Sequence, residues 1–190
     1  MFEQLKEKFP HLKDRWDSYV TLYKRIEVPA RTLLLTEGQI SKRFFLIEKG
    51  CLRAWFNNHG KDVTFQFFFE NEGLSSAESF KKNVPSLFNI ETVEPSIIHV
   101  LEKKHYEMMM SELGSEPAFL NQMIDVMFER QLHYMMQFLS FIRDTPAQRY
   151  QNLLNEKPHI VQRVPQHYIA SYLGITSVSL SRIRNKAKKP

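Results

Sequence analysis

The chain ends on the stretch YIASYLGITSVSLSRIRNKAKK, residues 168–189. Two short runs with apolar residues at helical spacing meet at Gly174, and the second run is rich in arginine and lysine. Glycine suits a tight corner, because it adopts a left-handed backbone at little cost. The stretch therefore predicts two short helices joined by a turn, the second of them strongly basic.

The apolar positions of this stretch match those that a helix-turn-helix buries between its two helices. Ala170 lies four residues before Gly174, where a small side chain lets the helices approach each other. Thr176 is well placed to cap the second helix. The remaining inward positions are aliphatic: Ile169, Leu173, Ile175, Leu180 and Ile183. The pattern predicts a helix-turn-helix, a motif whose second helix enters the major groove of DNA.

Charge is unevenly distributed along the chain. Residues 1–142 carry 17 Lys/Arg and 19 Asp/Glu, a net charge of −2, whereas residues 143–190 carry 9 Lys/Arg and 2 Asp/Glu, a net charge of +7. A basic module joined to a near-neutral one indicates a polyanionic partner, nucleic acid before membrane. Charge alone leaves open a tail that only solubilises the protein.

The outward positions of the second helix are the predicted DNA contacts. Arg182 can bind guanine O6 and N7 bidentately, and Val178 can contact a thymine methyl group. Residues nearer the edges are expected to position phosphates. The full predicted set is Ser177, Val178, Ser179, Ser181, Arg182, Arg184 and Lys186 on the second helix, with Gln166 and His167 on the first. The alternative for each is a solvated helix face.

Residues 26–101 have the composition and turn spacing of an all-β region. Short β-branched and aromatic runs such as RFFLIE and CLRAWF alternate with turn signals every 8–12 residues or so. Four of the six glycines fall at these turns, where a positive φ is expected. They are Gly38, Gly50, Gly60 and Gly73. The region predicts a β-sandwich, roll or barrel.

Helical patterns flank the β region. Residues 3–26 predict one or two amphipathic helices broken near Pro10, and residues 103–113 predict a short helix. Residues 118–143 contain no Gly or Pro and carry apolar residues on more than one face, so a helix of about 26 residues is expected. One stripe is expected to pack on the β region and another on a partner helix from a second copy of the chain. The alternative is a core helix against the C-terminal domain. The stretch Asp144-Thr145-Pro146 then predicts a hinge, and Thr145 is expected to cap the next helix.

Several classes of protein are disfavoured by composition. Cys51 is the only cysteine, which excludes an internal disulfide and a cysteine-ligated iron–sulfur cluster or zinc knuckle. The seven histidines are scattered, so no metal site and no cofactor can be identified. No apolar run approaches the ~20 residues that cross a bilayer. The N-terminus has no apolar signal segment, so a cytoplasmic protein without a membrane partner is expected.

The order of these parts resembles the CRP/FNR family of bacterial transcription regulators, over about residues 20–189. The resemblance rests on LLLTEGQISKRFFLIEKGCLRAWF with the later Gly60, and on IASYLGITSVSLSRIR; the β segment is similar to Bacteroidetes-type members. It implies an α+β fold, with N-terminal helices and a double-stranded, cyclic-nucleotide-binding-like β-roll (jelly roll) over 1–115. A long dimerisation helix over 116–143 and a winged-helix-like helix-turn-helix domain over 144–190 follow. It also implies a homodimer on a pseudo-palindromic operator, an effector in the roll, and RNA polymerase as a further partner.

The effector cassette departs from the family pattern. Members that bind cyclic AMP carry a Gly-Glu pair and, about ten residues later, an Arg-Ser pair. In GLSSAESFKKNVPSLFNIE, Ser75-Ser76 replace the first pair and Pro85-Ser86 the second. The missing arginine is the full cation that would oppose the phosphodiester, and Lys81 and Lys82 are expected on an exposed turn. Cyclic nucleotide is therefore not the expected effector. Ser75, Ser76, Glu78 and Ser86 either serve another, unknown ligand or satisfy backbone groups.

Three functional hypotheses follow from the sequence. The first is a homodimeric, sequence-specific transcription regulator of the CRP/FNR type, which is not an enzyme. The second is a small-molecule sensor whose basic C-terminal domain contacts protein or nucleic acid nonspecifically. The third, an enzyme with a cupin-like barrel, needs clustered metal ligands, and no His-x-His spacing occurs.

Overall fold

The computed structural model describes residues 13–187 of the chain. By their contacts these divide into two compact units, one covering 13–60 and 66–111 and the other 61–65 and 112–187. Within the described residues no helix is both long enough and apolar enough to cross a bilayer. The elements of the first part of the chain are α2 (Lys13–Val20), β1 (Lys24–Val28), β2 (Leu33–Leu35), β3 (Arg43–Lys49), β4 (Leu52–Asn58), β5 (Lys61–Phe68), β6 (Gly73–Leu74), α3 (Ala77–Lys82), β7 (Asn89–Thr92), β8 (Ser96–Glu102) and α4 (Lys103–Leu113).

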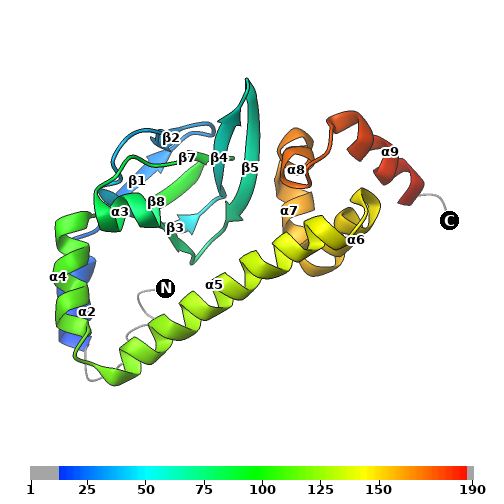
Figure 1. Cartoon of the computed structure of the whole chain (residues 1–190). Helices are drawn as coiled ribbons and strands as arrows, with labels where there is room; N and C mark the ends of the chain where they lie inside the picture. Colours follow the sequence, from blue (N-terminus) through cyan, green and yellow to red (C-terminus); the bar gives the residue numbers. More distant parts are fainter. Residues whose placement is uncertain (1–12, 188–190) are drawn as a thin grey trace. The chain divides into compact units, whose positions relative to one another are not determined.

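Two four-stranded antiparallel sheets form a β-roll (Figure 1). One sheet has the order β1-β8-β3-β6 and the other β2-β7-β4-β5. In the first sheet the apolar residues share one face, with Ile98 of β8 opposite Ile26 of β1 and Ile47 of β3. Ile47 and Ile98 are almost fully buried, as are Leu52 and Ile90 of the second sheet. The β-branched and aromatic runs thus supply both the strand propensity and the core.

The second unit is mainly helical. The helix α5 (Pro117–Arg143) is one continuous helix of 27 residues, which the absence of Gly and Pro after Pro117 permits (Figure 1). Thr145 caps the next helix through a capping box with Gln148, and Pro146 occupies its first turn. The helices that follow α5 are α6 (Pro146–Glu156), α7 (Pro158–Arg163), α8 (Gln166–Tyr172) and α9 (Ser177–Ala187). Among the described residues after Arg143 there are helices and no strand.

Much of the predicted architecture is confirmed. The β region, the long helix, the helix over 103–113 and the cap at Thr145 all occur where the sequence indicates them. Gly38, Gly50 and Gly60 have positive φ.

Three local expectations were wrong. The helix predicted to reach residue 26 ends at Val20, because the chain turns there and Lys24–Val28 pairs with β8. Lys81 and Lys82 are exposed as expected, but they lie in the last turn of a helix, α3, rather than in a turn. Gly73 has no positive φ, and its lack of a side chain instead admits the Phe44 ring, which an added Cβ would overlap. The part of the N-terminal helix prediction that falls on residues 3–12 lies outside the described residues.

Candidate nucleic-acid interface

The turn between α8 and α9 has the geometry of a glycine-ended helix. Gly174 adopts φ +67° directly after α8. The Ile175 amide donates to the Ala170 carbonyl at 2.9 Å, and the Gly174 amide to the Ser171 carbonyl at 3.0 Å. This pair of bonds is a Schellman motif, which satisfies the last carbonyls of α8. Two residues later the Thr176 hydroxyl accepts from the Ser179 amide at 3.1 Å, so α9 starts with the predicted cap.

The two helices pack through the residues that the sequence placed inward. Ala170 is 1% exposed and Leu180 is fully buried. Ile175 and Ile183 are only half-buried and lie at the margin of this small core. The remaining members, Ile169 and Leu173, are buried as well. The side chains on the other side of α9 are consequently left for solvent or a partner.

We expect Gly174→Ala to lower the free energy of unfolding by about 2 kcal/mol. A left-handed backbone costs a residue with a Cβ ~1–2 kcal/mol. The added Cβ would also lie 2.9 Å from Cε1 of Phe141, so that ring would have to move. Urea unfolding of the variant beside Asn185→Ala, an exposed change within α9, measures the effect. A loss below about 0.5 kcal/mol, the range of ordinary surface substitutions, would contradict this account of the turn.

Most of the predicted DNA-contacting residues lie together on the exposed face of α9. Val178 is 61% exposed at its N-terminal end. Ser177, Ser181, Arg182 and Lys186 are exposed on the same helix. Gln166 and His167 are exposed in the first turn of α8, where the His167 ring lies against Tyr168 with 4.0 Å between centroids.

Two of the predicted contacts are placed less favourably. Ser179 is half-buried and its hydroxyl lies 3.0 Å from the Thr176 hydroxyl, so this side chain takes part in the cap. Arg184 is also half-buried. Both remain candidates for phosphate contacts at the edge of the helix, since backbone-positioning groups need not face the bases.

The exposed face of α9 is cationic and has no internal counter-charge. Within the part of the chain that the structure describes, neither Arg182 nor Lys186 forms an ion pair with a carboxylate. The N-terminus of the helix adds partial positive charge at the end where Ser177 and Val178 lie. The amides at this end of the helix can therefore bind a phosphate, and Arg182 can donate to an acceptor on a base. DNA recognition uses both kinds of contact.

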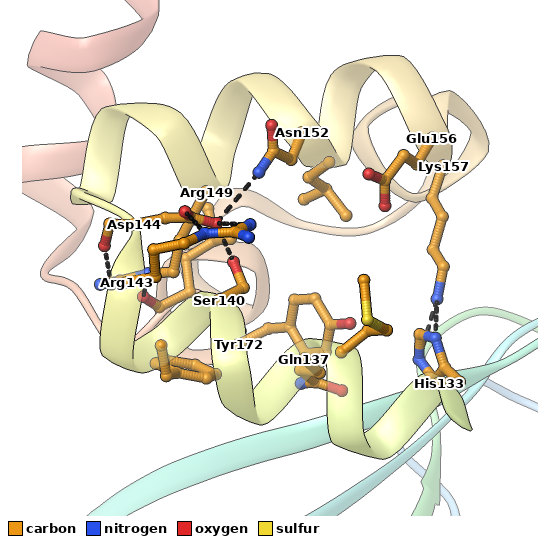
Figure 2. Close-up of a pocket in the computed structure, with 14 residues that line it drawn as sticks. His133, Gln137, Ser140, Arg143, Asp144, Arg149, Asn152, Glu156, Lys157 and Tyr172 are labelled. Carbon is orange, nitrogen blue, oxygen red and sulfur yellow. Dashed lines mark hydrogen bonds and ion pairs between the residues drawn. The ribbon is translucent and has the colours of Figure 1, made fainter. Parts of the chain in front are cut away.

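A polar junction joins α6 and α8 to the C-terminal end of α5 (Figure 2). The Asp144 carboxylate accepts from the Ser140 hydroxyl at 2.7 Å and from Nδ2 of Asn152 at 3.2 Å. Arg143 donates to it at 2.8 Å and, with Ser140, holds the pKa of Asp144 below its usual value. The Arg149 guanidinium donates to the carbonyls of Asp144 (2.9 Å) and Leu173 (3.1 Å), which ties α6 to the ends of α5 and α8. These contacts hold α6 and α8, the helices that precede α9, against the end of α5.

Next to this network is a cavity of about 130 Å³ between α5, α6 and α8 (Figure 2). Its far end contains His133 and Lys157, whose Nζ lies 2.9 Å from Nε2 and 3.2 Å from Nδ1 of the imidazole. Burial, and then the Lys157 ammonium, lower the pKa of His133. The imidazole is therefore held neutral near pH 7.

The lowered pKa of His133 predicts acid sensitivity. The folded chain binds a proton at His133 less readily than the unfolded chain does. The neutral imidazole therefore makes its full contribution to the free energy of unfolding above the ordinary pKa of about 6.5. It is lost as pH falls from there through the lowered folded pKa. Thermal unfolding between pH 7.5 and 5 should show a shallower loss of Tm for His133→Gln than for the unchanged chain. Identical pH profiles would contradict the prediction.

An apolar stripe runs along the opposite side of α5. Nine large side chains with exposed fractions of 37–68% fall within a sector of about 140° at 3.6 residues per turn. Among the described residues α5 is the helix that exposes most apolar surface, as its sequence pattern indicated. The apolar stripe consists of Leu120, Ile124, Met127, Phe128, Leu132, Met135, Phe138, Leu139 and Ile142.

Comparison with solved structures identifies the fold of the chain. No protein-family model and no curated protein sequence matches the chain. The c-di-GMP-responsive global regulator CLP of Xanthomonas campestris matches with a TM-score of 0.72 at 13% identity, over 90% of this chain and 89% of CLP. FixK2 of Bradyrhizobium japonicum matches with a TM-score of 0.71 at 15% identity, over 86% of this chain and 83% of FixK2. A CooA mutant from Carboxydothermus hydrogenoformans matches with a TM-score of 0.69 at 17% identity, over 90% of this chain and 78% of CooA.

The chain has the fold of the CRP/FNR regulators. The sequence resemblance is thereby confirmed at the level of fold, with the β-roll, the long helix and the C-terminal helices in the same order.

The predicted effector residues of this CRP/FNR-type roll are only partly brought together. The Ser86 hydroxyl donates to the Phe88 carbonyl at 2.7 Å and lies 3.0 Å from the Ser76 hydroxyl, and both serines are 2% exposed. Glu78 instead forms an exposed ion pair with Lys82 at 2.9 Å. Ser75 is half-buried. Ser76 and Ser86 thus satisfy each other and the backbone, which is one of the two roles that the sequence left open.

The roll also contains a buried charged pair that sequence reasoning missed. Arg53 of β4 is 2% exposed and contacts Glu91 of β7, its neighbour across the strands, with Nε–Oε2 at 2.8 Å and NH2–Oε2 at 2.6 Å. Its guanidinium also lies 4.7 Å from the Trp55 ring centroid. One sequence cannot tell which of many arginines is buried, because the partner carboxylate is 38 residues away.

Proposed function

We propose that the chain is a sequence-specific DNA-binding transcription regulator of the CRP/FNR type that acts in the cytoplasm as a homodimer on a pseudo-palindromic operator. The observation that carries the proposal is the α8–α9 unit, a helix-turn-helix whose second helix exposes Val178, Arg182 and Lys186. Among residues 13–187 neither of these two cations has an ion-pair partner. Such a helix meets the charge and shape requirements of major-groove readout.

The exposed residues of α9 have distinct expected roles. Val178 lies one turn before Arg182, so both can face one stretch of groove floor. Arg182 is suited to a guanine, and Val178 to a thymine methyl group. Lys186, one further turn along, is suited to a phosphate, as are Gln166 and His167 at the start of α8.

The homodimer is supported by the area of the apolar stripe on α5. At about 200 Å² for a large apolar side chain, the exposed fractions amount to on the order of 1,000 Å² per chain. A typical specific interface covers ~800 Å² per partner, and patches of this size are uncommon on monomers. The stripe follows steps of three and four residues over about three heptads, which suits a second copy of the same helix.

The effector of this regulator is proposed to be something other than cyclic AMP. The cassette has no arginine at the position that opposes the phosphodiester, and Ser76 and Ser86 bond to each other and to the backbone. Lys82 of the cassette forms an exposed ion pair with Glu78. A ligand of different charge, or activity without a ligand, fits these residues better than a cyclic nucleotide does.

Selection of random duplex DNA on the purified protein, at a stated salt concentration and with no ligand added, tests the proposal. We expect enrichment of a two-fold palindrome with half-sites about one helical turn apart. Retention of DNA that is salt-sensitive but shows no enriched sequence would favour the alternative, a sensor with a nonspecific basic domain. Repeating the selection with cyclic AMP should leave the enriched sequence and its yield unchanged.

A further inference from the structure

One polar residue interrupts the centre of the apolar stripe. Gln131 is exposed on α5 and lies eleven positions from each end of the stripe, since 131 − 120 and 142 − 131 are equal. Its amide has no hydrogen-bond partner within the described part of the chain. The residues at −7, −4, −3, +4 and +7 from it are all apolar and at least 47% exposed: Ile124, Met127, Phe128, Met135 and Phe138.

We propose that Gln131 fixes the register of the dimer by pairing with Gln131 of a second copy across the two-fold axis. The proposal rests on the proposed homodimer. In a symmetric pair of parallel helices each residue meets its own copy, so the two amides come together. A primary amide carries both donors and acceptors, so two glutamines can satisfy each other inside an otherwise apolar seam.

The apolar residues of the stripe specify register poorly by themselves. A shift of seven residues would again place apolar side chains opposite apolar side chains along most of the stripe. The same shift would bring Gln131 against Ile124 or Phe138 and would bury an amide without a partner. Each such amide weakens association about tenfold or more. A single polar residue at the midpoint therefore selects one register out of several that burial alone allows.

The register matters for the proposed function. A shift of seven residues displaces one helix by about 10 Å along the other. The two recognition helices would then no longer be related by the two-fold axis that a palindromic operator requires. Gln131 is a positioning residue in this sense, because its proposed role is to align the two helices.

Cysteine cross-linking can read the register directly. The native Cys51 is fully buried, so introduced thiols are the reactive ones. Met127→Cys alone reports the aligned parallel dimer, and Leu120→Cys mixed with Met127→Cys reports a shift of seven. Met127→Cys mixed with Met135→Cys reports an antiparallel pair centred on Gln131, in which positions 127 and 135 meet.

We expect only the aligned cross-link in the chain with Gln131. In Gln131→Leu the dimer should become about tenfold tighter by sedimentation equilibrium, and the shifted cross-link should appear at a comparable yield. Gln131→Asn, which keeps a primary amide, should retain the single register and serves as the matched control.

The possible failures are distinguishable. A Gln131→Leu dimer that stays aligned, or that dissociates more readily than the unchanged dimer, would overturn the role of Gln131 and leave the dimer intact. Cross-linking of positions 127 and 135 in the unchanged chain would overturn the parallel arrangement. A monomer at tens of micromolar would overturn the dimer itself, and with it the register proposal.

Discussion

Arg182→Ala is expected to reduce affinity for the selected operator by about 30-fold or more and to relax base preference at one position of each half-site. A bidentate arginine–guanine contact contributes ~1–3 kcal/mol, and a two-fold site contains two of them. Folding should be unaffected, because Arg182 is exposed and has no ion-pair partner within the described residues. Binding curves against the operator and against single-base variants give both quantities.

Lys186→Ala is the matched control for Arg182→Ala, since it removes one exposed cation one turn further along the same helix. If Lys186 contacts a phosphate, affinity should fall similarly for operator and unrelated DNA, and the salt dependence should drop by roughly one counterion per site. Equal losses of base discrimination in the two variants would contradict a base contact at Arg182. Unchanged discrimination in Arg182→Ala would favour the nonspecific basic domain.

Phe128→Glu is expected to abolish dimerisation at micromolar concentration and operator binding along with it. Phe128 is 65% exposed at the centre of the apolar stripe, three residues before Gln131. The substitution removes the burial of two phenyl rings, at ~1.5–3 kcal/mol each, and places two carboxylates close together in the seam. The dimer dissociation constant should rise by about 100-fold or more.

Sedimentation equilibrium and operator binding of the same preparation measure this prediction. Phe128→Leu keeps an apolar side chain and should remain a dimer that binds the operator. The circular dichroism of Phe128→Glu should match that of the unchanged chain, since the ring is largely exposed within one chain. A Phe128→Glu protein that dimerises normally would show that the second copy does not pack on this face of α5.

The sequence determined the elements whose signals are local. Alternation and turn spacing are enough to predict strands, and the absence of Gly and Pro after Pro117 is enough to predict one long helix. The α8–α9 turn belongs to the same class, because Ala170, Gly174 and Thr176 lie within seven residues and interact mainly with their own neighbours. The exposed face of α9 then follows from helical periodicity alone.

Tertiary structure decided the features that depend on distant residues. The helical prediction reaches residue 26, yet Lys24–Val28 forms β1, because pairing with β8, some 70 residues later, satisfies that backbone. The burial of Arg53 beside Glu91 is of the same kind, and so is the bond from Arg149 to the Leu173 carbonyl. Gly73 needs no positive φ, but the ring of Phe44 occupies the space of its missing side chain. The sequence by itself thus determined the order of the elements and the outward face of α9, since both depend on neighbours within a few turns. The burial of the Arg53–Glu91 pair and the bond that ties Arg149 to the end of α8 were decided only by folding, because the partners lie 38 and 24 residues apart along the chain.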